Sequence, residues 1–413
     1  MTDIGSVVIL GAGQGGLQLA MTLRDEGFRG RITMIGDEPY FPYQRPPLSK
    51  ALLTGAVDEE GVLLRPPAYF AEQEIEFRPG TRAVAIDRVE RNLVLATGEL
   101  VHYGHLVLAA GARNRRLPVP GAELAGVMQL RDLAEAIAIR DVLPQVRRAV
   151  VIGAGFIGLE FAASACAMGI EVTVIEAAPR PMARAISVPM SKFFRVRHED
   201  AGMRFRFETG VRAICGESGR ATGVETTAGE IIEADLVLVG IGVVPNTELA
   251  AAAGLEIQDG ILADDYLITS DPAISALGDC ARAPNRYSAL PLRIESVQNA
   301  VDQARCIAQR LTGKPAAYAA LPWFWSDQGG LKLQIAGLTG PHDEAVVRGD
   351  PESGKFSVFC FHRGRLLGAE SVNKVPEFTL ARRLLTQHFH GGGIGLTPGQ
   401  AADIGFDLKS LLT

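Results

Sequence analysis

The chain has 413 residues, of which 47% are hydrophobic and 21% are charged, and its formal net charge is −6 at pH 7. This length suffices for two or three domains with sizeable cores, and the composition is that of an ordinary globular protein. The acidic balance argues against nucleic acid as the main partner, and no apolar run approaches the roughly 18 residues of a membrane span.

The cysteines, the histidines and the N-terminus indicate the cellular setting. The five cysteines are scattered, with no CxxC pair and no metal-type spacing. His388-x-His390 has no further ligand nearby in the sequence, and the chain enters its first strand by Val7 without a signal-peptide pattern. We therefore expect a cytoplasmic protein with reduced thiols, no metal site and no membrane association.

The first predicted element is a buried parallel strand, Val7–Leu10, which runs into Gly11-x-Gly13-x-x-Gly16 and then into an apolar-periodic helix. In a dinucleotide site the first glycine makes the tight turn, the second lets the backbone approach a pyrophosphate, and the third lets helix and strand pack closely. Asp37 follows the strand Arg31–Ile35, about where an acidic side chain would meet a ribose hydroxyl. The stretch predicts a dinucleotide site; a glycine-rich turn of an ordinary α/β protein is the alternative.

A proline-rich segment, Pro39–Lys50, comes next. Its prolines forbid a continuous helix or a central strand, so the segment is predicted to be irregular and fixed. It follows the end of a strand, on the side where open α/β sheets bind ligands. Lys50 is therefore a candidate cofactor contact; a solvated lysine at a helix start is the alternative.

The opening pattern repeats after a β-rich stretch and a proline- and arginine-rich linker, Arg113–Pro120. The strand Ala149–Ile152 runs into Gly153-x-Gly155-x-x-Gly158, and the next strand ends at Glu176. Two complete fingerprints make an accident improbable. Glu176 favours NAD because a carboxylate accepts from a 2′-hydroxyl and repels a 2′-phosphate, although Arg180 and Arg184 nearby leave room for NADP.

The remainder of the chain predicts a return to the first domain and then a third domain. Val243–Asn246 is the predicted crossing, and Gly278-Asp279 places a carboxylate at a strand end, where it can hold a sugar hydroxyl or simply form a turn. An amphipathic helix is predicted over Ile294–Leu311. Beyond Leu321, alternating apolar residues are typical of antiparallel strands, and a helix is expected near Glu377–Phe389. The predicted domains are 1–113 with 246–320, then 114–245, then 321–413.

This order of motifs resembles the two-dinucleotide flavoprotein reductases of the glutathione-reductase fold, which is an α/β fold with two Rossmann-like domains plus a C-terminal α+β domain. Four stretches are similar to those of the putidaredoxin-reductase-like family of NADH-dependent ferredoxin reductases, which serve bacterial haem-thiolate monooxygenases and ring-hydroxylating dioxygenases. They are Pro46–Lys50, Gly278–Cys280, Arg293–Val297 and Trp323–Gln328. The resemblance covers essentially the whole chain; its least family-like part is Gly391–Gly395, which is predicted to be a flexible loop.

The resemblance implies FAD in the first site and NAD in the second. Val84 and Val297 would act through backbone groups or packing, because valine has no polar side-chain atom. With the fingerprint glycines, the implied FAD residues are Gly11, Gly13, Gly15, Gly16, Asp37, Lys50, Val84, Arg131, Asp279 and Val297. The implied NAD residues are Gly153, Gly155, Ile157, Gly158, Glu160, Glu176, Arg184 and Gly242.

Three residues are predicted to take part in the reaction itself. Glu160 lies one turn into the second fingerprint helix, and we expect it to pair with Lys50 across the flavin–nicotinamide stack. Trp325 is expected at the flavin edge near a docking surface, or else in the core of the third domain. Residues 37–55 contain no cysteine, and Cys280 has no partner cysteine nearby in the sequence, which favours inert packing over thiol chemistry.

The predicted reaction is hydride transfer from NADH to FAD, followed by two single-electron transfers to a two-iron two-sulfur ferredoxin. The ferredoxin is expected to bind transiently to a local basic face of a monomer. A rubredoxin reductase or an NADH oxidase of the same fold is the nearest alternative, and an NADH-sensing flavoprotein is another. Candidates for the basic face are Arg65, Arg286, Arg293, Arg305, Arg310 and Lys332.

Overall fold

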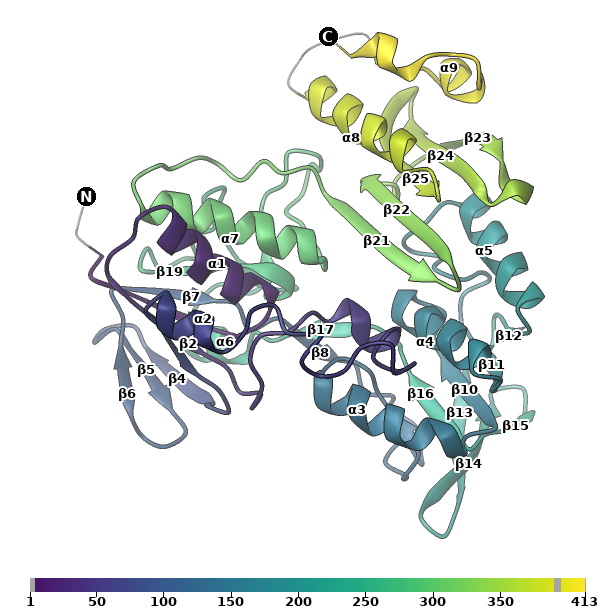
Figure 1. Ribbon diagram of the computed structural model, residues 1–413, viewed down its shortest axis with the longest axis horizontal. Helices are drawn as coiled ribbons and strands as arrows, with labels where there is room; N and C mark the ends of the chain where they lie inside the picture. The colour runs from purple at the N-terminus through teal and green to yellow at the C-terminus, as the bar shows by residue number, and fades with distance from the viewer. Residues whose placement is uncertain (1–3, 390–394, 413) are drawn as a thin grey trace. The chain divides into compact units, whose positions relative to one another are not determined.

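The structure, a computed structural model, describes residues 4–389 and 395–412. The chain forms two compact units, whose elements are labelled in Figure 1. The first unit holds the chain up to Gln44, Val62–Arg113 and Val244–Pro322; the second holds Arg45–Gly61, Asn114–Val243 and the chain from Trp323 onward. The two crossings carry the short strands β8 (Ala112–Asn114) and β17 (Val243–Pro245), where the sequence indicated only linkers.

A five-stranded parallel sheet forms the centre of the first unit. Its order is β19-β7-β1-β2-β3, and β1 (Ser6–Leu10) pairs with both β7 and β2. Val7 and Ile9 are fully buried, as expected for a parallel strand enclosed on both faces. The other strands are β2 (Arg31–Ile35), β3 (Ile75–Arg78), β7 (His105–Leu108) and β19 (Ile274–Ala276).

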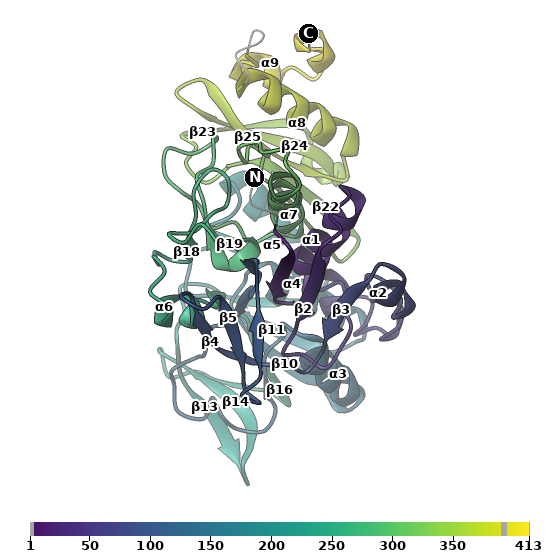
Figure 2. The same ribbon diagram turned by 90° about the vertical axis from the view of Figure 1, so that its left-hand side faces the viewer.

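Helices α1 (Gln14–Asp25) and α7 (Val297–Leu311) lie side by side on one face of this sheet (Figures 1 and 2). Leu23 of α1 and Ile307 of α7 share one core cluster with the sheet. The amphipathic helix predicted from Ile294 begins three residues later, because the Ser296 hydroxyl accepts a hydrogen bond from Asn299 N at 3.0 Å and caps the helix there.

The opposite face of the sheet packs against a second cluster. Val8 and Leu10 alternate with Val7 and Ile9 along β1 and join Leu93 of the small antiparallel sheet β4-β5-β6. The remaining elements of this unit are β4 (Ala83–Asp87), β5 (Asn92–Leu95), β6 (Leu100–His102), α2 (Ala68–Glu72), α6 (Glu248–Ala252), β18 (Ile261–Leu262), β20 (Ala281–Arg282) and the 3₁₀ helix η3 (Gly278–Cys280).

The second unit contains another parallel sheet, in the order β12-β11-β10-β16-β9. Its strand β10 (Arg148–Ile152) is followed by α4 (Phe156–Ala167) and β11 (Glu171–Ile175), the same succession as β1, α1 and β2. The antiparallel sheet β13-β14-β15 packs on it through Val224, which lies in one cluster with Val150. The other elements are η1 (Pro46–Ser49), β9 (Val127–Met128), α3 (Leu133–Val142), η2 (Leu143–Gln145), α5 (Val188–Asp200), β12 (Arg204–Arg206), β13 (Val211–Glu217), β14 (Arg220–Thr226), β15 (Ile231–Glu233) and β16 (Leu236–Val239).

The C-terminal part of the second unit is an antiparallel sheet, in the order β21-β22-β25-β24-β23. Leu333, Phe356 and Val358 are fully buried as expected, but all residues of Phe356–Phe361 in β24 are buried, so this strand is covered on both faces and does not show the predicted alternation. Residues 391–394 of the loop predicted at Gly391–Gly395 and the side chains of His388-x-His390 lie outside the part of the chain that the structure describes. The elements are β21 (Trp323–Gln328), β22 (Leu331–Gly337), β23 (Glu344–Asp350), η4 (Pro351–Ser353), β24 (Lys355–His362), β25 (Arg365–Val372), α8 (Val375–Phe389), α9 (Pro398–Ala402) and η5 (Leu408–Leu411).

A buried arginine ties the C-terminal residues to this sheet. Arg348 on β23 is 6% exposed, and its guanidinium donates to the carbonyl groups of Ala401, Ile404 and Phe406. It also pairs with Glu377 at the start of α8, at 3.4 Å. Because a buried guanidinium needs an acceptor for each donor, these carbonyl groups keep the chain around α9 packed on β23.

Candidate functional site

The turn after β1 is shaped by its three glycines. Gly11 has φ +118°, and a Cβ at Gly16 would lie 2.0 Å from the Gly11 carbonyl oxygen, so only glycine lets α1 approach β1 this closely. At Gly13, by contrast, a Cβ would meet no protein atom within 4 Å. Gly13 is the N-cap of α1 and has no capping side chain. The helix N–H groups therefore face open space, which fits the pyrophosphate of a dinucleotide.

Other predicted residues lie at the same edge of the first sheet, where its parallel strands end. Asp37 is exposed and follows β2, and Asp279 lies in η3 directly after β19. The N–H of Gly278 donates to Gln303 Oε1 of α7 at 2.7 Å, which joins η3 to this helix. Val297 is the first residue of α7, so its N–H has no partner within the helix. The structure thus brings the first fingerprint, both aspartates and this N–H to one edge.

The remaining predicted FAD contacts belong to other elements. Val84 is on β4, outside the parallel sheet, and is 49% exposed. Lys50 and Arg131 belong to the second unit, where the Arg131 carbonyl accepts from the Arg45 guanidinium and the Arg131 N–H donates to Glu135. A contact of these three residues with FAD stays a prediction.

The turn after β10 repeats the geometry of the first fingerprint. A Cβ at Gly158 would lie 2.4 Å from the Gly153 carbonyl oxygen, whereas one at Gly155 would meet no protein atom within 4 Å. Gly155 is the N-cap of α4, again without a capping side chain. Ile157, in the first turn of α4, is 44% exposed. The second turn therefore also fits a dinucleotide.

Glu176 follows β11 and is held in place by two backbone groups. Its carboxylate accepts from Ala154 N at 2.7 Å and from Ala178 N at 2.8 Å. The first of these bonds fixes the carboxylate beside the fingerprint turn itself. A negative group at this point accepts from a ribose hydroxyl and repels a phosphate.

The two arginines that left room for a 2′-phosphate differ in their surroundings. The Arg180 guanidinium donates to the carbonyl groups of Ile186 and Ala183, at 2.9 and 2.8 Å, so it holds its own loop. Arg184 is exposed, and its Nη2 lies 4.0 Å from where a Cβ of Gly242 would be. The structure thus places Arg184 and Gly242 together at the edge of the second sheet and engages Arg180 in packing the loop.

Lys50 and Glu160 form a buried ion pair in the second unit. Lys50 Nζ lies 2.8 Å from Glu160 Oε1, and the Glu160 side chain is only 4% exposed. The Ser49 hydroxyl donates to Glu160 Oε2 at 2.5 Å, and the Ser326 hydroxyl donates to Oε1 at 2.6 Å. The proline-rich segment supplies Ser49 and Lys50 because η1 begins with two prolines, which a first helical turn tolerates.

Strand β21 packs directly on the second fingerprint helix. The ring of Phe324 lies 4.5 Å from that of Phe156, the first residue of α4, and Ser326 reaches Glu160 one turn further along. Trp325, between them in sequence, is half-buried, and its ring lies 5.6 Å from that of Trp323. A position of Trp325 at a flavin edge stays a prediction.

Sequence reasoning missed the donors that surround Glu160. Ser49 and Ser326 both lie within stretches that carry the family resemblance, but nothing in their spacing indicates that they converge on one carboxylate. The sequence does show a serine next to a predicted site residue in both motifs: Ser49 precedes Lys50, and Ser326 follows Trp325.

Burial makes at least two of the cysteines poor nucleophiles. All five are free, and burial raises the pKa of the Cys280 and Cys166 thiols to about 11. Among the described residues no group of three or more His, Cys, Asp or Glu side chains is arranged to hold a metal ion. In the same part of the chain no helix is long and apolar enough to cross a membrane.

A buried glutamate from the C-terminal sheet holds the start of α5. Glu370 on β25 is fully buried, and its carboxylate accepts from both the backbone N–H and the hydroxyl of Ser187, at 2.8 and 2.6 Å. Thr339 donates to the Ala185 carbonyl beside it. These bonds fix the loop that carries Arg184. Burial is the dominant influence on Glu370 and raises the pKa of its carboxyl group.

We expect the melting temperature of a Glu370→Gln variant, relative to that of the wild type, to be higher at high pH than at low pH. The folded wild type binds this proton more tightly than the unfolded chain does, so its stability falls as pH rises from the ordinary value of 4.5 through the raised folded pKa. Glutamine has no such titration. Melting curves at pH 4 and pH 8 measure the effect, with exposed Glu344→Gln as the control; a difference between Glu370→Gln and wild type that is equal at both pH values would contradict it.

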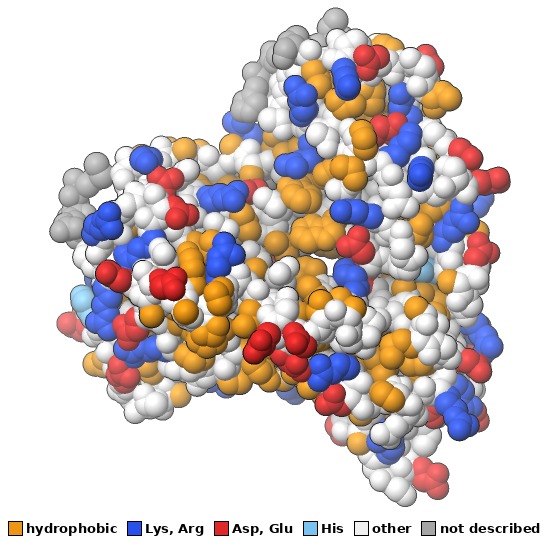
Figure 3. Space-filling model, viewed as in Figure 1, with side chains coloured by type: hydrophobic (Ala, Val, Ile, Leu, Met, Phe, Trp, Pro, Cys, Tyr) orange, Lys and Arg blue, Asp and Glu red, His pale blue; other side chains and the backbone are white. Residues whose placement is uncertain are grey.

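The predicted basic face requires a correction. Arg310 is half-buried and donates to the Ser275 hydroxyl at 2.6 Å, and the Arg293 side chain is 11% exposed and pairs with Glu295. Neither is available as a docking cation, because each already serves the packing of the first unit. Lys and Arg side chains alternate with Asp and Glu side chains over the face shown in Figure 3.

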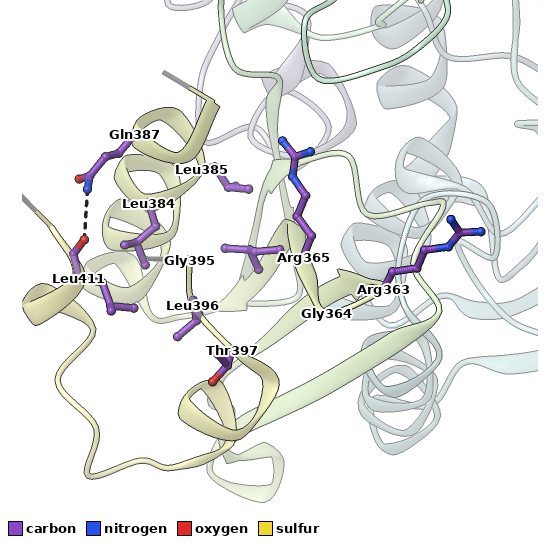
Figure 4. A pocket seen from close by; sticks show the side chains of 11 residues that line it. Arg363, Gly364, Arg365, Leu384, Leu385, Gln387, Gly395, Leu396, Thr397 and Leu411 are labelled. Atoms are coloured by element: carbon purple, nitrogen blue, oxygen red, sulfur yellow. Dashed lines mark hydrogen bonds between the residues drawn. The ribbon is translucent and has the colours of Figure 1, made fainter. Parts of the chain in front are cut away.

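A hollow of about 260 Å³ lies in the C-terminal part of the second unit (Figure 4). Arg365, Leu384 and Leu396 are among the residues that line it, and Gln387 donates to the Leu411 carbonyl at its rim. None of the predicted site residues lines this hollow. It therefore plays no part in the dinucleotide sites.

The two parallel sheets, each with an open glycine fingerprint, fit a protein that binds two dinucleotides. Residues 5–304 match the pyridine nucleotide-disulphide oxidoreductase family, and residues 323–412 match the reductase C-terminal family. The chain belongs to the pyridine nucleotide-disulphide oxidoreductase family, and within it to the ferredoxin reductases. Its cofactors are accordingly FAD and NAD(P)H, which the two open turns fit.

The relatives support this placement along the whole chain. Rhodocoxin reductase from Rhodococcus erythropolis is 52% identical over 404 residues, which cover 98% of this chain and 93% of the relative. A ferredoxin reductase from Rhodopseudomonas palustris has a solved structure with a TM-score of 0.95 at 49% identity, covering 98% of this chain and 99% of that one. The covalent putidaredoxin reductase–putidaredoxin complex gives a TM-score of 0.94 at 38% identity, with 98% and 97% covered.

Proposed function

We propose that the protein passes electrons from NADH through FAD to a two-iron two-sulfur ferredoxin that serves a haem-thiolate monooxygenase or a ring-hydroxylating dioxygenase. The observation that carries the proposal is the pair of open fingerprint turns with a buried Lys50–Glu160 pair, and no thiol pair among the described residues. When bound, FAD takes up a hydride from NADH and gives single electrons onward. The chain itself then has to bind and align the two dinucleotides.

The residues of the first unit are proposed to hold FAD. The N–H groups at the start of α1 would bind its pyrophosphate, and Asp37 would accept from its ribose. Asp279 would hold a hydroxyl of the sugar-alcohol chain, and the N–H of Val297, which has no partner within its helix, would offer a donor at the start of α7. Val84 and Arg131 are proposed as further FAD contacts on the resemblance alone.

The residues of the second unit are proposed to hold NADH rather than NADPH. Glu176 is fixed beside the fingerprint turn by Ala154 N, so a 2′-phosphate would meet a carboxylate there. Arg180 is engaged by its own loop and cannot compensate without releasing that loop. Gly155, Ile157 and Gly242 would line the path of the dinucleotide, and Lys50 with Glu160 would align it against the flavin.

The finer points of the partner and the setting are also proposals. We expect a monomer in the cytoplasm, with the three domains predicted from the sequence, and a ferredoxin that docks transiently through charge. The printed names of the relatives, rhodocoxin reductase and a putidaredoxin reductase bound to putidaredoxin, support a small redox protein as the partner. A rubredoxin would be the alternative partner, and molecular oxygen the alternative acceptor.

NADH-driven reduction of cytochrome c by the purified flavoprotein tests this function. We expect the rate to depend strongly on an added two-iron two-sulfur ferredoxin and to fall as salt rises, because the proposed contact is electrostatic. A parallel assay with rubredoxin in place of ferredoxin identifies the alternative partner. Rapid oxygen consumption without either protein would make it an oxidase, and flavin that stays reduced with both would make it a sensor.

A further inference from the structure

A chain of buried hydrogen bonds leads from helix α5 to the Glu160 carboxylate. His198 Nε2 lies 2.8 Å from Gln328 Oε1, and Gln328 Nε2 donates to the Ser326 hydroxyl at 3.0 Å. Ser326 in turn donates to Glu160 Oε1 at 2.6 Å. All four side chains are at least nine-tenths buried, and all belong to the second unit.

The chemistry of each group fixes the direction of this chain. An amide oxygen only accepts, so His198 Nε2 must carry the hydrogen, and burial lowers the pKa of His198 and keeps the ring neutral. The Gln328 amide group donates one hydrogen to Ser326 and faces the Met182 sulfur with the other. Because Ser326 accepts from Gln328, its own hydrogen is left for Glu160. Every donor along the chain therefore points toward the carboxylate.

The chain of hydrogen bonds joins residues from the two parts of the sequence that match different families. Glu160 and His198 lie within residues 5–304, whereas Ser326 and Gln328 lie on β21, within residues 323–412. Strand β21 is therefore more than a packing surface for α4. It supplies the third donor to a carboxylate whose other donors, Ser49 and Lys50, both come from the proline-rich segment.

We propose that Ser326, Gln328 and His198 are positioning residues for the Lys50–Glu160 pair. Ser326 fixes the rotation of the Glu160 carboxylate, and Gln328 and His198 fix the hydroxyl of Ser326. The Lys50 ammonium and the Ser326 hydroxyl both contact Oε1 of Glu160. If the carboxylate rotated, the ammonium would therefore move with it. The inference rests on the proposed role of this pair in aligning NADH with the flavin, and it assigns part of that role to the C-terminal sheet.

The first test compares two buried serines of the C-terminal sheet. Ser326→Ala removes the donor to Glu160, and Ser357→Ala is the matched control, because Ser357 is equally buried and donates to Glu377 at 2.6 Å. In stopped-flow mixing of the holoenzyme with saturating NADH, Ser326→Ala should slow flavin reduction roughly tenfold with little change in the half-saturating NADH concentration. Ser357→Ala should stay within about twofold of wild type, and Ser326→Thr should restore the rate.

Two outcomes of this comparison overturn the proposal. One is a Ser326→Ala enzyme that is reduced as fast as Ser357→Ala. The other is a loss of rate that Ser326→Thr does not restore although the protein melts at the wild-type temperature. A wild-type enzyme that NADH does not reduce would instead contradict the proposed function, so the two failures are distinguishable.

The second test needs no turnover. Histidine-selective ¹⁵N labelling of the holoenzyme reports the tautomer of each ring, and His198→Asn identifies the signal of His198. We expect a neutral ring with its hydrogen on Nε2, which the direction of the chain requires. In Gln328→Leu this preference should be lost. A neutral ring with its hydrogen on Nδ1 in the wild type would leave Nε2 without a hydrogen to donate, break the hydrogen-bond chain at its first bond and overturn the proposal.

Discussion

Replacing Glu160 with glutamine should slow reduction of the flavin by NADH about 100-fold, the scale expected when a positioning contact is lost. Glutamine keeps the shape of the side chain and one accepting oxygen, so one of the two serine hydroxyls can still donate to it, while the amide nitrogen faces the other. It removes the negative charge, however, and leaves the Lys50 ammonium, whose side chain is 21% exposed, without its partner. Stopped-flow absorbance of the flavin at saturating NADH measures the rate directly.

The matched control for Glu160→Gln is Glu59→Gln. Glu59 also anchors the segment Arg45–Gly61, through Arg140 at 2.9 Å, but this pair lies at the surface. Exposed pairs contribute little, so Glu59→Gln should reduce at the wild-type rate. Lys50→Met should lose about as much as Glu160→Gln, and the double variant should lose hardly more, because both changes remove one interaction. Single variants that both react at the wild-type rate would exclude the pair from the reaction.

The sequence predicts the fingerprints well because their requirements are local. A glycine is needed at Gly16 whatever the rest of the fold does, since its neighbour is the Gly11 carbonyl five residues earlier. Glu176 is likewise found by counting from the glycines along one strand. The strands after Leu321 are predictable only in part: alternation finds apolar positions such as Leu333 and Phe356, but it does not indicate that β24 is buried on both faces.

The surroundings of Glu160 are not predictable in this way. Ser49, Ser326 and His198 come from three elements far apart in the sequence, and each by itself is an unremarkable polar residue. The same limitation affects Arg310, because an arginine on an amphipathic helix gives no sign that a buried hydroxyl, here that of Ser275, accepts from it. Only the packing of elements reveals such partners.

Valine at the middle glycine of each fingerprint should separate cofactor binding from folding. At Gly13 and Gly155 a Cβ meets no protein atom within 4 Å, so the chain tolerates it, but it would project into the space proposed for a pyrophosphate. Gly13→Val should therefore be purified folded but largely without yellow colour. Gly155→Val should keep its flavin and need roughly tenfold more NADH for half-maximal reduction, as for the loss of one charge-assisted contact.

The third glycine gives the opposite expectation and makes the comparison decisive. At Gly16 the added Cβ would lie 2.0 Å from a backbone oxygen, so Gly16→Val should fail to fold rather than fold without cofactor. Circular dichroism distinguishes the two kinds of failure, and flavin absorbance per protein reports binding. If Gly13→Val retained a full complement of FAD, or Gly155→Val responded to NADH as the wild type does, the open space at that turn would not be where the dinucleotide phosphates bind. The two turns have the same geometry, but Gly13→Val is measured by bound flavin and Gly155→Val by the NADH concentration needed for reduction. Each variant is therefore also a control for general damage to the protein in the other.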